Sequence, residues 1–156
     1  MKKYELTDES IIHDGRRLFR IRALISFATV SVGDLGGFVE TEENLSHDDK
    51  AWVYGNAQVY DNAWVCGDAM VYGNASVCGD AQVCGDADYM TVRGLGSAFR
   101  TTTVCKDATK GISVKCGCFF GSLQDFEAKV KETHCDSKFA KEYLKLIELI
   151  KIHFEL

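Results

Sequence analysis

His47 is the residue of this sequence that comes nearest to catalytic chemistry, because it stands between Ser46 and Asp48. A histidine with a pKa near neutrality can remove a proton from a hydroxyl or an amine. Ser, His and Asp in immediate succession do not form a catalytic triad, however, since the members of a triad converge from separate parts of a chain. We therefore expect a solvated loop histidine and assign no catalytic residue.

A second group with reactive side chains is formed by cysteines in the C-terminal half. Cys116 and Cys118 fall on one face of a predicted strand, with Cys105 across a hairpin and Cys135 beyond it. This spacing is not one of the usual CxxC patterns of zinc sites. We expect small buried hydrophobic side chains here rather than metal ligands.

Two further pairs of residues stand eighteen positions apart, Cys66 with Cys84 and Asp68 with Asp86. The cysteines should lie close enough for a disulfide, although parallel side-chain vectors make the geometry poor. In a chain without a secretion signal we expect thiols rather than a disulfide framework. The carboxylates should repel unless they are solvated, protonated or bridged by a cation such as Ca²⁺. Solvation is the expectation, so we assign no metal and no cofactor.

The elements that position these residues are set by six tandem hexads between Ala51 and Asp86, which read AWVYGN, AQVYDN, AWVCGD, AMVYGN, ASVCGD and AQVCGD. Ala opens every hexad, Val is third, Gly or Asp is fifth, and Asn or Asp is sixth. This period fits a chain that turns a corner every six residues. The central valines should point inward and their neighbours outward. These valines are Val53, Val59, Val65, Val71, Val77 and Val83.

The hexads resemble the hexapeptide repeats of left-handed parallel β-helices, in which three hexads make one triangular coil. The resemblance implies a mainly β fold with a short β-helix of two clear coils, to which the degenerate flanks add one or two. We expect a single domain, 1–156. Residues 1–30 form a hairpin turning at Asp14-Gly15, and residues 31–90 an entry loop and the β-helix. Residues 91–120 form a second hairpin. Residues 121–156 form two helices, the first capped by Ser122 and the second by Asp136 or Ser137.

Charge is concentrated in the middle of the chain, although the overall net charge is only −5. Residues 31–50 contain one basic residue, Lys50, and six acidic ones. Residues 51–90 contain five Asp and no Lys or Arg, so each of the two segments has a net charge of −5. The aspartates are either corner-forming residues or an acidic surface offered to a basic partner. The corner aspartates that would contact such a partner are Asp61, Asp68, Asp80 and Asp86.

One face of the hexads is predicted to be aromatic, because Trp52 and Tyr54 should stack on Met70 and Tyr72 at the eighteen-residue spacing. This face is too apolar to be left bare in water. We expect either the C-terminal hairpin and helices or another chain to cover it, and we include these four residues in the partner-binding site.

The last predicted helix also carries apolar residues away from its main stripe. Leu144, Leu149 and Ile152 lie on this second side. The excess of apolar surface predicts self-association into a homo-oligomer.

The whole chain resembles a family of small phage and prophage proteins of gut Firmicutes. The resemblance rests on RRLFRIRAL, GDLGGFVETEENLSHD, the YGNA hexads and the tail GCFFGSLQDFEAKVKETHCDSKFAKEYLKLIELIK. It implies a fold and a phage setting rather than an activity. The hexads alone are also similar to the β-helix of acyltransferases, in which a histidine near a coil edge acts as the base.

These observations predict a non-enzymatic interaction protein in the cytoplasm of a bacterial host, with no membrane segment and no direct contact with nucleic acid. The expected partner is a host protein, such as a CRISPR nuclease or another nucleic-acid-binding defence protein, which the acidic β-helix would inhibit. Two alternatives stay open. One is a relative of the acyltransferases that uses His47, and the other is a structural or assembly component of the phage.

Overall fold

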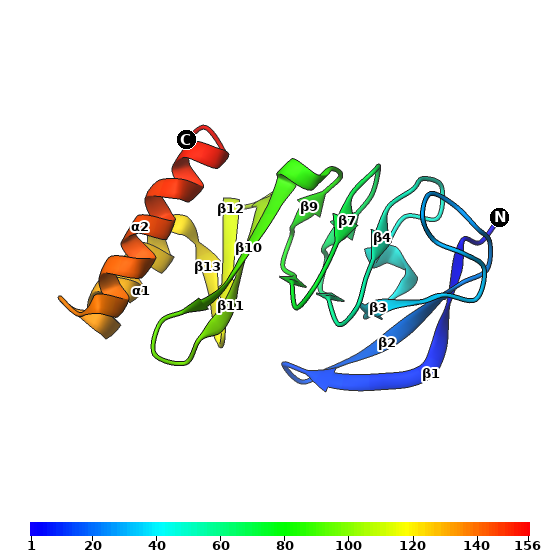
Figure 1. Cartoon of the computed structure of the whole chain (residues 1–156), viewed down its shortest axis with the longest axis horizontal. Helices are drawn as coiled ribbons and strands as arrows, with labels where there is room; N and C mark the ends of the chain where they lie inside the picture. The colour runs from blue at the N-terminus through cyan, green and yellow to red at the C-terminus, as the bar shows by residue number, and fades with distance from the viewer.

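The computed structural model describes residues 1–156 and is mainly β, with two α-helices at the C-terminal end (Figure 1). Three parts follow one another along the long axis of the molecule. The N-terminal strands lie at one end, the hexads are in the middle, and a second sheet with the helices lies at the other end. The N-terminal strands are β1 (Tyr4–His13), β2 (Arg16–Ala23) and β3 (Leu35–Val39).

The predicted N-terminal hairpin is confirmed. β1 and β2 pair antiparallel, and His13 lies opposite Arg16 across a two-residue turn. Asp14 and Gly15 in this turn have φ angles of 51° and 76°. Two successive positive φ values match the right-handed twist of a hairpin, and Asp-Gly tolerates them.

Each hexad contributes one strand of two residues. The strands are β4 (Trp52–Val53), β5 (Gln58–Val59), β6 (Trp64–Val65), β7 (Met70–Val71), β8 (Ser76–Val77) and β9 (Gln82–Val83). They pair in parallel as β4 with β7, β5 with β8 and β6 with β9, so each residue lies opposite the one eighteen positions later. All six central valines are fully buried, which confirms their inward assignment.

The segment before the hexads joins this parallel arrangement. β3 pairs parallel with β5, where Val39 lies opposite Val59, and Leu45 forms a parallel bridge to Val65. A short 3-10 helix, η1 (Glu42–Asn44), connects the two and is capped by Thr41. The entry segment therefore pairs with the first three hexads and forms an irregular layer in front of them.

After the hexads, η2 (Asp86–Asp88) leads into an antiparallel sheet of four strands. These are β10 (Tyr89–Leu95), β11 (Arg100–Asp107), β12 (Gly111–Cys116) and β13 (Phe119–Ser122). The predicted hairpin corresponds to β11 and β12, whereas β10 and β13 extend the sheet on both sides.

The chain ends in α1 (Leu123–His134) and α2 (Lys138–His153). The Ser122 side chain accepts from the Asp125 N–H, and the Ser137 side chain accepts from the Ala140 N–H, so both helices begin where the sequence predicts. Neither helix combines the length and the apolar character that crossing a membrane requires.

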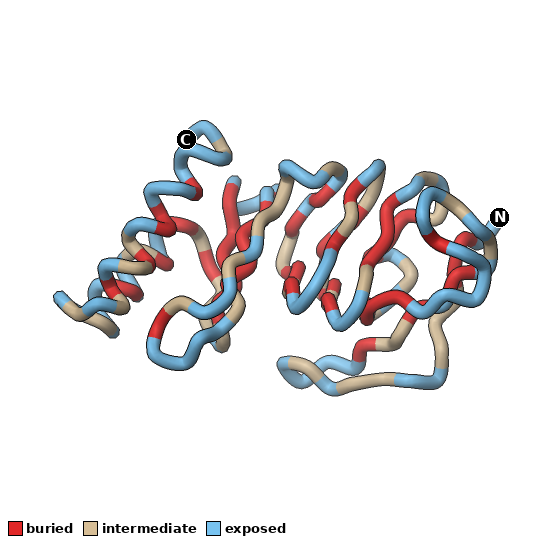
Figure 2. Tube along the Cα trace, viewed as in Figure 1, coloured by how far each residue is buried: buried red, intermediate tan, exposed pale blue.

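Buried residues gather in two main clusters, which Figure 2 shows as separate red groups. One cluster fills the interior of the hexads and extends to the N-terminal strands. The other lies between the second sheet and the two helices. The prediction that the C-terminal helices cover the aromatic face of the hexads is therefore wrong, because their apolar stripe is used against β11 and β12.

The parallel hydrogen bonds of the hexads all run in one direction. Trp52 N donates to Ala69 O at 3.0 Å, Gln58 N to Ala75 O at 2.9 Å and Trp64 N to Ala81 O at 2.9 Å. The first three hexads form one layer and the last three form the next. The first layer consequently directs carbonyl oxygens away from the second, and the second layer directs N–H groups away from the first. A buried backbone group without a partner is costly, so both ends need complementary groups.

Side-chain donors meet the carbonyl end. Lys3 Nζ donates to Ala51 O at 2.6 Å, and Asn44 Nδ2 donates to Ala63 O at 2.9 Å. Tyr4 Oη donates to Leu45 O at 2.8 Å.

Side-chain acceptors meet the amide end. Met70 N donates to Asp86 Oδ1 at 3.0 Å, and Cys84 N donates to Asp88 Oδ2 at 2.9 Å. Ser76 N donates to Thr103 Oγ1 at 3.0 Å. The types of the capping side chains thus match the polarity of each end.

Candidate interaction surface

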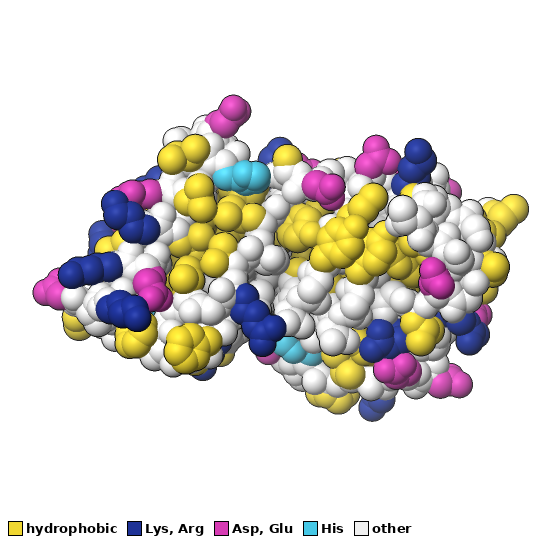
Figure 3. All heavy atoms as spheres, viewed as in Figure 1, with side chains coloured by type: hydrophobic (Ala, Val, Ile, Leu, Met, Phe, Trp, Pro, Cys, Tyr) yellow, Lys and Arg dark blue, Asp and Glu magenta, His cyan; other side chains and the backbone are white.

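A stacked aromatic pair, of which Tyr72 is exposed and Tyr54 is half-buried, lies on the hexads where the sequence predicts it. The rings of Tyr54 and Tyr72 stack with centroids 4.4 Å apart and an interplanar angle of 14°. Tyr72 is 49% exposed, and its hydroxyl donates to Met70 Sδ at 3.1 Å. We call Tyr54, Met70 and Tyr72 the tyrosine face. Figure 3 shows hydrophobic side chains gathered over this part of the molecule, with acidic side chains along one edge.

Trp52 does not belong to the exposed surface. It is 1% exposed and packs edge-on against Phe27, with centroids 5.4 Å apart, and against Tyr4, at 6.1 Å. The N-terminal segment therefore covers this end of the aromatic row, rather than the C-terminal elements or another chain. The prediction that Trp52 contacts a partner is wrong.

Two of the four predicted partner-binding aspartates are held by the chain itself. Asp61 forms an ion pair with Arg16 and accepts from Gly79 N at 3.3 Å. Asp80 accepts from Thr109 and Asn62, and these hydrogen bonds hold the pKa of Asp80 below its ordinary value. Both carboxylates thus act within the fold, as corner residues do.

The other two aspartates lie exposed beside the tyrosine face. Neither Asp68 nor Asp86 has a Lys or Arg side chain within ion-pair distance. Asp86 uses one oxygen to accept from Met70 N at 3.0 Å. Partial burial raises the pKa of Tyr72, and Tyr54 and Asp86 act in the same direction. Two carboxylates without cationic partners therefore border an exposed aromatic surface.

His47 is part of the packing at the carbonyl end. Its Nδ1 accepts from Lys3 N at 3.1 Å, and its ring stacks on Tyr4 with centroids 4.1 Å apart. Nε2 lies 3.7 Å from Glu42 Oε2. Burial lowers the pKa of His47, although Glu42 opposes this effect. Nδ1 is thus used within the fold, whereas Nε2 is buried without a hydrogen-bond partner.

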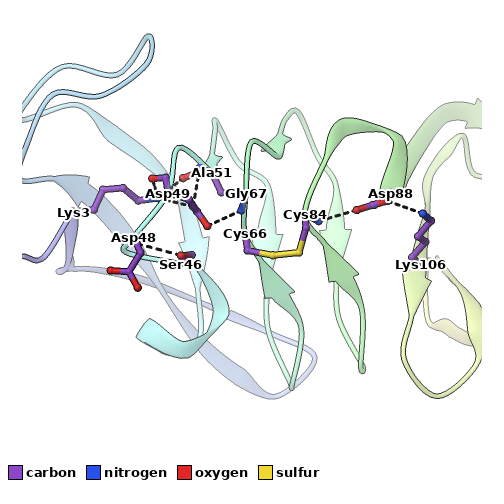
Figure 4. The surroundings of a disulfide bond; sticks show 10 residues. All are labelled: Lys3, Ser46, Asp48, Asp49, Ala51, Cys66, Gly67, Cys84, Asp88 and Lys106. Carbon is purple, nitrogen blue, oxygen red and sulfur yellow. Dashed lines mark hydrogen bonds and ion pairs between the residues drawn. A yellow bond between two sulfur atoms is a disulfide. The ribbon is translucent and has the colours of Figure 1, made fainter.

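Cys66 and Cys84 form a disulfide between adjacent layers, with Cα atoms 4.4 Å apart (Figure 4). The expectation of free thiols is wrong for this pair. The neighbouring Gly67 has a φ of 66°, and a Cβ there would collide with the carbonyl of Cys84. The approach of the two layers at this corner therefore requires glycine.

The five remaining cysteines are free thiols. Cys78, Cys105 and Cys116 are buried, and burial raises the pKa of Cys78 to about 11. Cys118 and Cys135 are exposed. No group of three or more His, Cys, Asp or Glu side chains is arranged to hold a metal ion.

Three of the four arginines of the N-terminal hairpin form ion pairs with acids of the same region, and Arg17 contacts the Ser10 hydroxyl. Arg16 pairs with Glu40 at 2.9 Å, Arg20 with Glu9 at 2.9 Å, and Arg22 with Glu5. Binding to nucleic acid depends on a row of cationic groups free to meet phosphates. This hairpin does not offer such a row.

The predicted self-association residues divide into two kinds. Ile152 is 74% exposed and Leu149 is 50% exposed, so α2 does present apolar side chains outward. Leu144 instead packs partly against the cluster of the second sheet. It therefore contributes less surface than the sequence suggests.

Two cavities open between the parts of the molecule. The larger, of about 980 Å³, lies between β9, the β11–β12 hairpin and the helices. Four of its charged groups form two ion pairs, Lys106 with Asp88 at 2.9 Å and Lys151 with Glu127 at 3.9 Å. The smaller, of about 370 Å³, is lined by polar residues of β5, β8 and β11.

Comparison with known proteins adds no family assignment. No protein-family model matches the chain, and no curated protein matches it either.

Proposed function

We propose that this protein is a non-enzymatic interaction module built on a short left-handed parallel β-helix. The parallel pairing at an eighteen-residue offset supports the β-helix, as do the six buried valines. The corner residues support it as well. The fifth residue of five hexads has a positive φ, between 59° and 67°, at Gly55, Asp61, Gly67, Gly73 and Gly79. Such a scaffold holds its surface side chains in fixed positions.

The tyrosine face with Asp68 and Asp86 is the proposed binding surface. The observation that carries the proposal is the exposed ring of Tyr72, stacked on the half-buried Tyr54 beside these carboxylates. An arginine side chain suits this arrangement. Its guanidinium stacks on an aromatic ring and pairs with a carboxylate in the same plane. The partner is therefore a basic protein that presents arginine side chains.

The resemblance of the chain to phage and prophage proteins supports a partner from a bacterial host. Proteins that bind nucleic acids carry exposed arginines, and occupying these would block the nucleic acid. We accordingly propose that the protein acts in the host cytoplasm and inhibits a nucleic-acid-binding defence protein, of which a CRISPR nuclease is an example.

Self-association through α2 is part of the same proposal. Leu149 and Ile152 are exposed three positions apart on one helical face, where a second copy would cover them. Sedimentation over a concentration series should show an oligomer that the double variant Leu149→Ser/Ile152→Ser reduces to monomer. Monomer alone in the wild-type protein would contradict this part.

The binding surface is tested with the variant Asp68→Asn/Asp86→Asn/Tyr72→Ala. Asn keeps the acceptor oxygen for Met70 N and removes the charge, so the fold should persist. Wild-type and variant protein are used to retain proteins from a bacterial lysate, at rising salt. We expect a retained protein that the variant loses and that salt releases, because screening acts over about 10 Å at ordinary ionic strength.

The matched control is Glu132→Gln/Glu148→Gln, which removes two charges from the exposed faces of α1 and α2. It should retain the same protein as the wild type. Equal retention by all three proteins would contradict the proposed surface. Finding the protein in purified phage particles would instead favour an assembly role, and acyl-CoA binding in calorimetry would favour a transferase.

A further inference from the structure

A pocket lined by no hydrophobic residue lies on a side of the hexads that the proposed function does not use. It has a volume of about 370 Å³ and is formed where the tip of the N-terminal hairpin, two hexad corners and the β11–β12 strands meet. Polar side chains line it, among them Asn56, Gln58, Asn74, Arg100, Thr101 and Lys115.

Five of these side chains have hydrogen-bonding groups that the chain does not use. Asn56, Gln58, Asn74, Arg100 and Thr101 make no side-chain hydrogen bond and no ion pair within the protein. The hairpin arginines differ in this respect, because each of them contacts an acceptor of the chain. The guanidinium of Arg100, which lies over Gly117, is therefore a free cationic group in an acidic protein.

Beside the pocket lies a connected set of ion pairs and hydrogen bonds centred on Asp14. Lys115 Nζ lies 2.9 Å from Asp14 Oδ2, and its side chain is only 10% exposed. Tyr60 Oη donates to the same oxygen at 3.1 Å and lies 3.1 Å from Ser76 Oγ. His13 Nε2 is 3.4 Å from Asp14 Oδ2. Asp14 balances the charge of Lys115, so Arg100 supplies the net positive charge.

The arrangement of the amides follows from the repeat. Asn56 and Asn74 are the sixth residues of the first and fourth hexads, and Gln58 and Ser76 follow them on the paired strands β5 and β8. The eighteen-residue register therefore places two Asn side chains on adjacent layers. An amide offers both donors and an acceptor, which is the combination that hydroxyl groups need.

We infer that this pocket binds a small anion that carries several hydroxyl groups, such as a sugar phosphate or a sugar acid. The planar fork of Arg100 matches a phosphate or carboxylate group. The side-chain amides of the pocket and the Thr101 hydroxyl would form hydrogen bonds with the hydroxyl groups of the ligand. The volume is at the lower end of the range of small-molecule sites, about 300–1,000 Å³.

The test is a titration of the ¹⁵N-labelled full chain, followed by NMR, with glucose 6-phosphate, gluconate, glucose and inorganic phosphate in separate arms. We expect saturable shifts at the amides of Asn56, Asn74 and Thr101 with one or both of the hydroxylated anions. The stronger of these two identifies the anionic group. Glucose and inorganic phosphate should bind at least tenfold more weakly. Equal binding of inorganic phosphate, or no saturable shift in any arm, would overturn the inference.

The variant Arg100→Gln should weaken binding of the hydroxylated anion at least tenfold, because it removes the fork and its charge. Arg100 is exposed and makes no internal contact through hydrogen bonds, so the variant should melt like the wild type. The control Lys129→Gln removes one positive charge from α1, away from the pocket, and should bind as the wild type does. An equal loss in both variants would show general attraction between charges and would contradict the site.

Discussion

The ammonium group of Lys3 donates to the carbonyl oxygen of Ala51 at 2.6 Å, although the two residues stand 48 positions apart. A second bond reaches Asp49 O at 3.1 Å, and Lys3 as a whole is 1% exposed. Burial lowers the pKa of Lys3, while the nearby Asp49 opposes this effect. The N-terminus is thereby joined to the first hexad by a cation that is almost completely withdrawn from water.

Replacing Lys3 with alanine should lower the free energy of unfolding by about 1–3 kcal/mol, because the carbonyls of Asp49 and Ala51 lose their donor. Denaturant unfolding measures the loss. Lys2→Ala is the control, since Lys2 is an exposed neighbour in a surface ion pair with Glu42. It should change stability by less than about 1 kcal/mol. Equal effects of the two substitutions would contradict the role given to Lys3.

Val65→Asp should abolish cooperative melting, because it buries a charge without a partner among the valines and costs several kcal/mol. Circular dichroism during heating shows the transition. Gln82→Asp adds the same group at an exposed position of the strand paired with β6 and should melt close to the wild type. A normal transition in Val65→Asp would mean that the valine does not face the core.

Reduction of Cys66–Cys84 should destabilise the fold. The cysteines are 18 residues apart, and closing a loop of this size stabilises a protein by about 3 kcal/mol. For a chain of this length, that corresponds to a fall in melting temperature of roughly 6–12 °C. A reductant should lower the melting temperature of the wild type and of Cys118→Ser, but not that of Cys66→Ser/Cys84→Ser. Insensitivity of the wild type would show that the disulfide does not stabilise the fold.

The stability of the protein should fall as the pH drops below about 6.5. His47 has a lowered pKa in the folded state, so the unfolded chain, with a histidine pKa of about 6.5, takes up its proton first. The contribution of His47 is complete above this value and is lost as the pH approaches the folded pKa. Protonation would also place a donor on Nδ1, which now accepts from Lys3 N.

The measurement is the free energy of unfolding between pH 7 and pH 5. In His47→Asn, the Asn Oδ1 can accept from Lys3 N, and the free energy of unfolding should fall less between pH 7 and pH 5 than in the wild type. His153→Gln changes an exposed histidine and should leave this fall unchanged. Identical pH profiles for the wild type and His47→Asn would refute the assignment.

The elements with a local signal could be predicted from the sequence. Asp14-Gly15 marks a hairpin by its own backbone preference, Ser122 marks a helix start by its hydroxyl, and Val65 marks a buried position by its place in the repeat. In each case the cause lies within a few residues of the effect. For this reason the hairpin, both helices and the inward valines agree with the structure.

The covering of Trp52 could not be predicted, because it depends on contacts with distant residues. Phe27 lies in an irregular segment without periodicity, and nothing near it indicates that it packs on a hexad. The same holds for Asp61 and Arg16, which meet only after the hairpin folds back. A count of charges along the sequence therefore overstates the free acidic surface.

The capped ends of the hexads also decide how the molecule can assemble. A stack of parallel strands with bare ends would take up further copies end to end, as strands add to a cross-β fibre. Here Lys3 and Asn44 occupy the carbonyl end, and Asp86 and Asp88 occupy the amide end. An incoming chain meets no row of free backbone groups at either end. End-to-end growth of the hexad stack is thus blocked within each molecule, and an oligomer has to form through other surfaces.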